Sequence, residues 1–523
     1  MRRGIQLFSL ILFALLFVLS PLVEKLTLPP DLFLKADPLL GISAVLASRR
    51  LLGLLLWSLP VLLSAFVAGR FFCGWLCPLG TCFELCSTKK AQKKNPVPKK
   101  AKFYLLLFLL AAAACTVNIA GIFDPIALIT RAFTIILYPL TMLGAATGLE
   151  IFRPAADYLS LITLSHAQVH EPVFSLLPLT VIVMLALFVL NYTYPRFWCR
   201  SLCPLGALLG VGARLGFFRR RVTDGCTSCM KCARDCPAGA LGQEPREYDP
   251  QECICCLKCG KICPAHAVDF SPGTGAAAGQ TDMGRRGLLT TAAAGALTAF
   301  AITKDTAEKV NENRLIRPPG ALPESLFQGT CIRCGQCMKI CPTNTLQPCL
   351  FEAGIAGIWS PRLKTRLAGC DQTCSLCGTV CPTGAIRELT LDEKKHAKLG
   401  TASLDRNRCL VWAQDRLCLI CDEQCPYNAI VFKWKDGMRR PIVIDTKCNG
   451  CGFCEQVCPV QGRSAIEVSQ HGEIRLAEGS YIEKARELQL EFKNEPGDDA
   501  FIQESEQPES ASPQKLPEGI RAN

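Results

Sequence analysis

Eight of the nine cysteines between residues 226 and 264 place the strongest constraint on the fold of this chain. They follow the spacing C-x2-C-x2-C-x3-C-P twice, at Cys226, Cys229, Cys232 and Cys236, and again at Cys253, Cys256, Cys259 and Cys263. Three closely spaced thiolates can bind three irons of one [4Fe–4S] cluster, while the fourth cysteine normally binds the neighbouring cluster. The proline after each fourth cysteine lacks an N–H, so it turns the chain away from the site.

This spacing is typical of two-cluster bacterial ferredoxins. A zinc site is one alternative, but zinc usually takes cysteines in two separated pairs. A disulfide framework is another, because the chain has 33 cysteines among its 523 residues. Their spacing nevertheless follows the cluster motif and not that of a small secreted scaffold. Two complete motifs in succession therefore favour iron–sulfur clusters.

Four further motifs lie between residues 331 and 459. Two have the standard spacing, one opens with three residues between its first two cysteines, and one has a long first gap. Their cysteines are Cys331, Cys334, Cys337, Cys341, Cys370, Cys374, Cys377, Cys381, Cys409, Cys418, Cys421, Cys425, Cys448, Cys451, Cys454 and Cys458. The six motifs together predict six [4Fe–4S] clusters with these cysteines as iron ligands. The spacing leaves open whether neighbouring motifs pair or the first pairs with the fourth, and we expect the surplus Cys255 and Cys349 to pack.

The first 222 residues predict a helical membrane domain, because the hydrophobic half of the composition concentrates there. We expect four spans, at residues 5–23, 51–68, 103–122 and 172–192. A signal peptide is the alternative for the first of them. The apolar segment 125–149 carries Arg131 and Pro139, so we expect a helix at the membrane interface, with a true span as the alternative.

Charge predicts the orientation of this domain. Residues 87–102 contain seven lysines and no acid, and residues 219–221 are three arginines. Such runs favour the cytoplasmic side, and four spans with a cytoplasmic N-terminus place both there. The net charge of +12 is therefore explained by membrane orientation, and we expect no nucleic-acid partner.

An eleven-residue pattern occurs twice in this domain, as RFFCGWLCPLG at residues 70–80 and as RFWCRSLCPLG at residues 196–206. It supplies four more thiols, Cys73, Cys77, Cys199 and Cys203. A C-x3-C spacing places two cysteines about one helical turn apart on one face. The four thiols could bind a metal centre, form a disulfide or contact a redox partner, and a structural Cys-Pro turn is the alternative. Duplication at equivalent places favours a redox role.

The duplicated Cys-x3-Cys-Pro pattern on a four-span core, followed by residues 226–264, resembles the NapH-type membrane ferredoxins. Those proteins are associated with periplasmic nitrate reductase, and related membrane ferredoxins occur in nitrous-oxide respiration and in cytochrome oxidase maturation. The resemblance implies that the chain takes electrons from quinol and passes them on.

A twin arginine, Arg285-Arg286, precedes the weakly apolar residues 287–302. This pattern is typical of Tat export and predicts a short span or anchor. A surface helix is one alternative, and cleavage after the Ala299-x-Ala301 sequence is another. With the proline-rich residues 317–323, this stretch resembles the start of the exported NapG and MauM polyferredoxins. The chain thus resembles a fusion of a NapH-type protein with a NapG/MauM-type protein.

The predicted fold is an α-helical membrane domain of four spans plus an interfacial helix, followed by α+β ferredoxin domains, with a fifth short span or anchor between them. The predicted division is a membrane domain (1–222), a two-cluster module (223–272), a linker with the anchor (273–303), a linker (304–325), a four-cluster domain (326–470) and a polar, largely disordered tail (471–523). We expect residues 223–272 in the cytoplasm and residues 326–470 in the periplasm of a bacterium, on the two sides of its inner membrane.

These features predict an iron–sulfur electron-transfer protein that oxidises quinol for a periplasmic reductase or cytochrome. The chain has five histidines and no C-x-x-C-H motif, so we expect no haem. Quinol oxidation releases protons, and His166 and His170 are candidate acceptors on a predicted periplasmic loop. The alternative interpretation is that they are solvated loop histidines with no role in the reaction. A redox maturation factor for a metalloenzyme and an iron–sulfur regulatory protein are the alternative functions.

Overall fold

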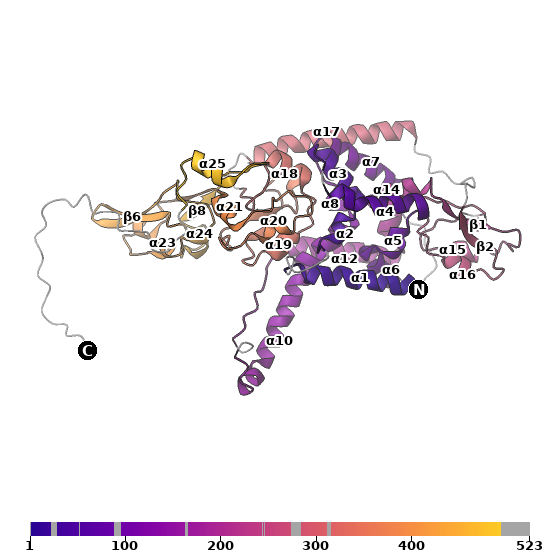
Figure 1. The fold of residues 1–523 in the computed structure, drawn as a ribbon, viewed down its shortest axis with the longest axis horizontal. Helices are drawn as coiled ribbons and strands as arrows, with labels where there is room; N and C mark the ends of the chain where they lie inside the picture. Colours follow the sequence, from indigo (N-terminus) through magenta and orange to yellow (C-terminus); the bar gives the residue numbers. More distant parts are fainter. Residues whose placement is uncertain are drawn as a thin grey trace, which may run out of the picture.

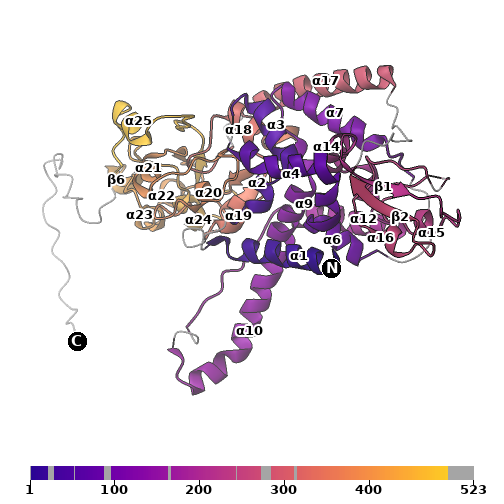
Figure 2. The same cartoon turned by 45° about the vertical axis from the view of Figure 1, so that its right-hand side comes forward.

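The computed structural model describes residues 2–21, 29–51, 53–87, 96–162, 166–242, 244, 246–272, 284–310 and 315–492. The chain forms three parts in a row, with a helical body between two ferredoxin parts (Figure 1). The small part that carries the motifs of residues 226–264 is called the N-terminal ferredoxin part, and the larger part that carries the motifs of residues 331–459 is called the C-terminal ferredoxin part. The turned view in Figure 2 keeps the body between these two parts.

The helical body consists of α1 (Arg2–Val18), α2 (Leu32–Lys35), α3 (Pro38–Ser48), α4 (Leu54–Ala68), α5 (Phe71–Trp75), α6 (Pro78–Leu85), α7 (Ala101–Ala114), α8 (Ala120–Phe123), α9 (Pro125–Ala132), the π-helix η2 (Phe133–Leu137), α10 (Tyr138–Tyr158), α12 (Leu177–Thr193), α13 (Phe197–Ser201) and α14 (Pro204–Ala213). Several helices begin where an Asp-Pro or Cys-Pro pair supplies a side-chain acceptor and a proline in the first turn. Asp37 accepts from Leu39 N in this way, and Asp124 accepts from Ile126 N.

The four predicted spans correspond to α1, α4, α7 and α12, which have 17, 15, 14 and 17 residues. A bilayer core needs about 20 helical residues, so the prediction of four spans is not confirmed. Among the described residues, two helices are long and apolar enough to cross, Pro125–Tyr158 with 34 residues and Arg285–Asp305 with 21. The second overlaps the predicted anchor.

The segment expected at the membrane interface is helical and continues through α9, η2 and α10 to Tyr158 instead of ending at residue 149. Its α10 portion projects away from the body and crosses the direction of α1 (Figures 1 and 2). Large apolar side chains on α10 are exposed, including Ile151 at 76% and Phe152 at 65%. This helix is therefore the one apolar element of the described body that stands clear of its core.

The N-terminal ferredoxin part is held together by a two-stranded antiparallel sheet of β1 (Phe218–Val222) and β2 (Val268–Pro272). Its motifs carry the short helices α15 (Lys231–Arg234) and α16 (Lys258–Lys261). The strands join the first and last residues of this part, so the two cysteine motifs lie within one closed loop of chain.

The C-terminal ferredoxin part contains α18 (Glu324–Thr330), α19 (Gln336–Ile340), β3 (Leu346–Pro348), η3 (Ile355–Gly357), β4 (Pro361–Leu363), α20 (Leu376–Thr379), α21 (Leu391–His396), β5 (Thr401–Leu404), α22 (Leu410–Ala413), α23 (Ile420–Glu423), β6 (Ile430–Lys435), β7 (Met438–Val443), α24 (Phe453–Val457), β8 (Ile466–Ser469) and α25 (Tyr481–Glu487). Three antiparallel pairs form, β3 with β4, β5 with β8, and β6 with β7. The short strands agree with the predicted α+β ferredoxin class.

Two predicted segments contain regular structure. Helix α17 (Arg285–Val310) extends into the expected linker 304–325, in which Leu315, Ile316 and Arg317 are buried. Helix α25 lies within the expected tail 471–523 and packs Tyr481 against the domain with no exposed surface. Burial of a large aromatic ring stabilises this segment. Residues 493–523 lie outside the described residues.

Helix α17 lies along α7 on the outside of the body (Figure 1). The helices approach closely at Gly295, where a Cβ atom would lie 2.7 Å from the Phe108 carbonyl oxygen. Only glycine permits this approach. Beyond the contact, Asp305 Oδ2 accepts a hydrogen bond from Ile355 N at 3.0 Å, which ties α17 to the C-terminal ferredoxin part.

The two ferredoxin parts contact opposite ends of α7. At the start of α7, Lys102 Nζ donates to Glu252 Oε2 of the N-terminal part at 2.6 Å. Just past the other end of α7, Asn118 Nδ2 donates to the Gly329 carbonyl of the C-terminal part at 3.1 Å. Lys339 donates to the Phe17 carbonyl at the end of α1. The length of the helical body thus separates the two parts.

Candidate iron–sulfur sites and the cysteine repeat

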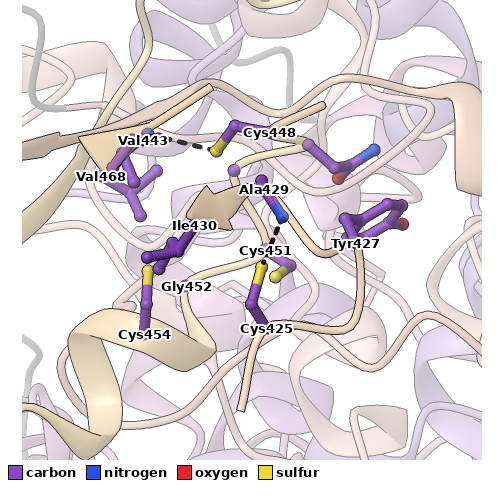
Figure 3. Close-up of a pocket in the computed structure, with 13 residues that line it drawn as sticks. Cys425, Tyr427, Ala429, Ile430, Val443, Cys448, Cys451, Gly452, Cys454 and Val468 are labelled. Atoms are coloured by element: carbon purple, nitrogen blue, oxygen red, sulfur yellow. Dashed lines mark hydrogen bonds between the residues drawn. The ribbon is translucent and has the colours of Figure 1, made fainter. Parts of the chain in front are cut away.

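The best-defined candidate cluster site lies at the far end of the C-terminal part. One cavity is lined by Cys448, Cys451 and Cys454 from the last motif and by Cys425 from the motif before it. Their sulfur atoms point toward a common space between β6 and the loop before α24 (Figure 3). Three ligands from one motif and the fourth from its neighbour is the arrangement that a two-cluster ferredoxin needs.

A second cavity in the same region has the reciprocal arrangement, with its fourth cysteine supplied by the last motif. It is lined by Cys409, Cys418 and Cys421, together with Cys458 from the last motif. The long first gap of this motif, between Cys409 and Cys418, is taken up by α22. The third and fourth motifs of the C-terminal part therefore pair with each other.

The first two motifs of the C-terminal part pair in the same way. Cys331, Cys334 and Cys337 line one cavity with Cys381 of the second motif. The thiol of Cys377 interacts electrostatically with Cys370, Cys374 and Cys341. The structure thus places neighbouring motifs together, an arrangement that spacing alone left open.

The N-terminal ferredoxin part follows the same rule. Cys253, Cys256 and Cys259 line a cavity with Cys236 of the first motif. This arrangement leaves Cys226, Cys229, Cys232 and Cys263 for the second site of the pair. The Arg220 guanidinium contacts the Cys232 sulfur at 3.6 Å from Nη2, which places a positive charge beside that site.

Backbone N–H groups donate to the cysteine that crosses between motifs. Ala240 N lies 3.4 Å from Cys236 Sγ, Ile386 N lies 3.4 Å from Cys381 Sγ, and Ala429 N lies 3.3 Å from Cys425 Sγ. Hydrogen bonds to sulfur help set the reduction potential of iron–sulfur clusters. The donor set and these hydrogen bonds both fit [4Fe–4S] clusters.

Burial of the cysteines also affects how iron binds to these sites. It raises the pKa of the Cys370 thiol to about 11 and that of Cys421 to about 12. Since the thiolate is the metal ligand, binding of iron has to displace these protons. Among the described residues, no group of three or more His, Cys, Asp or Glu side chains is arranged to hold a single metal ion. Thiolates that bind different irons of a cluster need not converge on one point.

The duplicated repeat brings its four thiols into one buried core. Cys73, Cys77, Cys199 and Cys203 are 3–9% exposed and belong to the same cluster of buried residues. Cys77 begins α6 and accepts from Gly80 N at 3.4 Å, and Cys203 begins α14 and accepts from Gly206 N at 3.2 Å. The two copies therefore have the same local structure.

Two arginines connect the copies across this core. Arg70, the first residue of one copy, donates to the Cys199 carbonyl at 3.0 Å. Arg196, the first residue of the other copy, approaches the Cys73 carbonyl at 3.5 Å. Both arginines are 2% exposed. Each copy of the repeat begins with an arginine in the sequence. This repetition could have indicated that the two arginines have equivalent structural roles.

The two arginines have different carboxylate partners. Arg70 Nη1 lies 3.2 Å from Glu252 Oε2 of the N-terminal ferredoxin part, while Arg196 pairs with Glu84 of α6. Glu252 is fully buried and also accepts from Lys102. The first copy is thus linked directly to the polypeptide that carries Cys253 and Cys256.

The remaining candidate residues lie elsewhere. His166 and His170 are exposed on the segment between α10 and α12, and neither lines a described cysteine cavity. Cys255 and Cys349 are buried, and Cys255 Sγ lies 2.9 Å from the Ala68 carbonyl. These contacts agree with the packing role expected for the two surplus cysteines.

Comparison with protein families identifies iron–sulfur segments in both halves of the chain. A 4Fe-4S binding domain matches residues 50–95, 176–223 and 377–398, and another family of that description matches residues 326–347. A 4Fe-4S dicluster domain matches residues 416–461. The segments 50–95 and 176–223 each contain one copy of the Cys-x3-Cys-Pro repeat. No solved structure matches the chain.

These sites and matches define a ferredoxin-type iron–sulfur protein. The methylamine utilization ferredoxin-type protein MauM of Methylorubrum extorquens is 36% identical over 181 residues, 33% of this chain and 79% of the relative. The ferredoxin-type protein NapG of Escherichia coli is 34% identical over 164 residues, 29% of this chain and 69% of the relative. The chain belongs to the family of NapG- and MauM-type ferredoxin proteins, and these relatives support an electron-transfer role.

Proposed function

We propose that the chain is a membrane-bound carrier that takes electrons from quinol and passes them, one at a time, to a periplasmic reductase or cytochrome. The observation that supports this function is a continuous buried core. It contains the repeat cysteines and Cys334 of the C-terminal part, and the partly buried Cys236 and Cys256 of the N-terminal ferredoxin part pack against it. A nitrate-reductase-type partner system is proposed from the family resemblance.

The chemistry divides between clusters and side chains. A [4Fe–4S] cluster bound at each cysteine site would exchange one electron at a time. Quinol oxidation releases two electrons and two protons, so two single-electron transfers and two proton acceptors balance the reaction. His166 and His170 are the proposed acceptors, because they are exposed to solvent close to the start of α12.

Membrane attachment is supported by the surface of the body. Leu56 on α4 is 75% exposed, Ile182 on α12 is 63% exposed and Leu185 is 61% exposed. Such exposed apolar side chains suit a lipid environment. We propose that the N-terminal ferredoxin part faces the cytoplasm, because it contacts Lys99 and Lys102 of the lysine-rich segment. The C-terminal part would then face the periplasm.

The alternative functions have less support. A maturation factor that reduces a client's thiols or metal through the repeat would need accessible cysteines, yet all four are buried. No feature of the described residues favours a regulatory role over electron transfer.

The test is reduction of the purified chain by quinol in lipid nanodiscs without oxygen. We expect quinol to bleach the visible iron–sulfur absorption, and a soluble electron acceptor added afterwards to restore it. A chain in which His166 and His170 are both replaced by Asn should be reduced more slowly at neutral pH, while Glu171→Gln serves as the matched control. Absence of reduction by any quinol, with intact clusters, would reject quinol oxidation.

A further inference from the structure

We propose that Cys73, Cys77, Cys199 and Cys203 bind an iron–sulfur cluster of their own, and that this cluster passes electrons between the two ferredoxin parts. The second half of this proposal rests on the proposed electron-transfer function, whereas the first half does not.

The donor set is the first argument. Each copy of the repeat contributes two cysteines, and four cysteine thiolates are the ligand set of both [2Fe–2S] and [4Fe–4S] clusters. All four side chains pack in the same buried core, and the Cys203 thiol interacts electrostatically with each of the other three. The N–H groups of Gly80 and Gly206 donate to sulfur just as Ala240 and Ala429 do in the ferredoxin motifs.

Unpartnered donors around the four thiols are the second argument. Arg70 Nε, Arg196 Nε and Trp198 Nε1 are buried and lack a hydrogen-bond acceptor. A buried donor that lacks an acceptor is unfavourable, because it has lost its hydrogen bonds to water. The two arginines interact electrostatically with the repeat thiols. A cluster held by four thiolates is an anion with sulfide acceptors, so it would place negative charge near the two arginines and supply acceptors for the unpartnered donors.

The position between the ferredoxin parts is the third argument. On one side, Arg196 interacts electrostatically with Cys256, and Trp75 Nε1 donates to the Cys255 carbonyl at 3.0 Å. On the other side, the Cys77 thiol interacts with Asp124 at the start of α9.

Helix α9 continues the path to the C-terminal part. Arg131, near the end of this helix, interacts electrostatically with Cys334, and its Nη1 donates to the Arg333 carbonyl at 3.3 Å. The eight residues of α9 rise only about 12 Å. The four thiols therefore lie one short helix away from the C-terminal cysteines.

The length of the body favours such a centre. Helices α7 and α1 have 14 and 17 residues and contact the C-terminal part at their ends. They span about 21–26 Å. Without an intermediate centre, one electron would have to cross most of that length in a single step.

A cluster at the repeat divides the path. It would accept one electron from the reduced cluster bound by Cys253, Cys256, Cys259 and Cys236, and give one electron to the oxidised cluster bound by Cys331, Cys334, Cys337 and Cys381. The opposite direction balances equally, and no bond to substrate forms or breaks.

Iron and sulfide content of the full chain, purified without oxygen, tests the site. Six cubane clusters hold about 24 irons, and we expect the wild-type chain to contain two or four more. The double substitution Cys73→Ser, Cys199→Ser should remove that excess and its Mössbauer component, while the other cluster signals stay. The matched control is Cys86→Ser, Cys115→Ser, which changes two exposed cysteines.

A wild-type content of about 24 irons, bound zinc, or a disulfide between the repeat cysteines in the mass spectrum would overturn the site. The wild-type measurement decides this even if the double variant does not fold. Because no quinol is used, failure of quinol oxidation leaves this result unaffected.

The electron path is tested in quinone-free vesicles with the chain in one orientation. External dithionite, which does not cross the membrane, should reduce clusters of both ferredoxin parts in the wild type. It should reduce only the facing part in the Cys73→Ser, Cys199→Ser variant. Equal reduction of both parts in that variant would overturn the path.

Discussion

Arg70 donates a hydrogen bond from Nη2 to the backbone carbonyl of Cys199 at 3.0 Å, although the two residues lie in different copies of the repeat. The Arg196 guanidinium makes the reciprocal contact to Cys73 O at 3.5 Å. Gly206 leaves room for this arrangement, because a Cβ atom there would lie 2.5 Å from Arg70 Nη2 and the guanidinium would have to move. The arginines therefore fix the two copies relative to each other.

Removal of the shared carboxylate should be more damaging than removal of one arginine. Glu252→Gln leaves Arg70 and Lys102 buried without their counter-charge, so we expect a loss of about 3–5 kcal/mol in stability. Arg70→Met leaves Glu252 paired with Lys102, so its cost should be smaller. Thermal unfolding in detergent measures both variants. Equal destabilisation by the two would contradict the shared role of Glu252.

Double substitutions test the pairing of cysteine motifs. Cys409→Ser and Cys458→Ser affect the same cavity, so their combination should lose one cluster, about four irons. Cys409→Ser and Cys425→Ser affect two cavities, so that combination should lose two clusters. Iron analysis and EPR spectroscopy distinguish the outcomes. The reverse pattern would mean that each motif binds its own fourth ligand.

Stability of the C-terminal part should depend on the ionisation of Glu324. Burial raises the pKa of this carboxyl group, but Arg317 and Arg475 outweigh burial and lower it to about 2. A depressed pKa contributes stability above the unfolded value of about 4.5 that is lost as pH falls toward 2. At pH 7, Glu324→Gln should destabilise this part by about 3 kcal/mol, with a shrinking difference below pH 4.5.

Denaturant titrations at several pH values measure this effect, with loss of the iron–sulfur absorption as the signal. Glu478→Gln is the control, because that side chain is 84% exposed in its pair with Arg50. A wild-type advantage over Glu324→Gln that grows on acidification would show that the sign is wrong.

Close packing of α17 on α7 should depend on Gly295. Gly295→Val places side-chain atoms against the Phe108 carbonyl and the Ala111 Cβ, and overpacking of this kind costs about 1–3 kcal/mol. Gly144→Ala is the matched control, since nothing lies within 4 Å of its Cβ position. Thermal unfolding should show a lower midpoint for Gly295→Val alone. An unchanged midpoint would indicate that α17 can leave α7 without loss.

Reporters of membrane side should separate the two ferredoxin parts. We expect a reporter near residue 270 to be active in the cytoplasm and one near residue 400 to be active in the periplasm. The physical reason is that the two parts contact opposite ends of α7. Activity of both reporters on one side would exclude the proposed placement of the two ferredoxin parts on opposite sides of the membrane.

The cysteine spacing predicted the ferredoxin class because three ligands of a cluster lie within a few residues of each other. Pairing could not be predicted, since it brings Cys425 to Cys448 across the β6–β7 hairpin. The same limit applies to Arg70, whose acceptor on Cys199 lies 129 positions away. Local patterns predict local ligands, while contacts between distant segments depend on the folded chain.

Composition did not predict where every helix forms. The polar composition after residue 471 suggested disorder, yet Tyr481 packs with Leu389 and Ile474 and stabilises α25. The hydrophobic runs of the first half predicted where α1, α4, α7 and α12 occur, but not their lengths. Helix α7 ends at Ala114 although the predicted span continued to residue 122, and α12 begins at Leu177 instead of residue 172.

The place of α17 in the body gives the chain an order of assembly. This helix contacts α7, yet the whole N-terminal ferredoxin part lies between them in the sequence. The surface of α7 around Phe108 therefore stays uncovered during synthesis until the first two cysteine motifs have emerged. In the proposed topology, delivery of the C-terminal part draws α17 across the bilayer and covers that surface. Packing of α17 on α7 would then occur only in chains whose C-terminal part has reached its compartment.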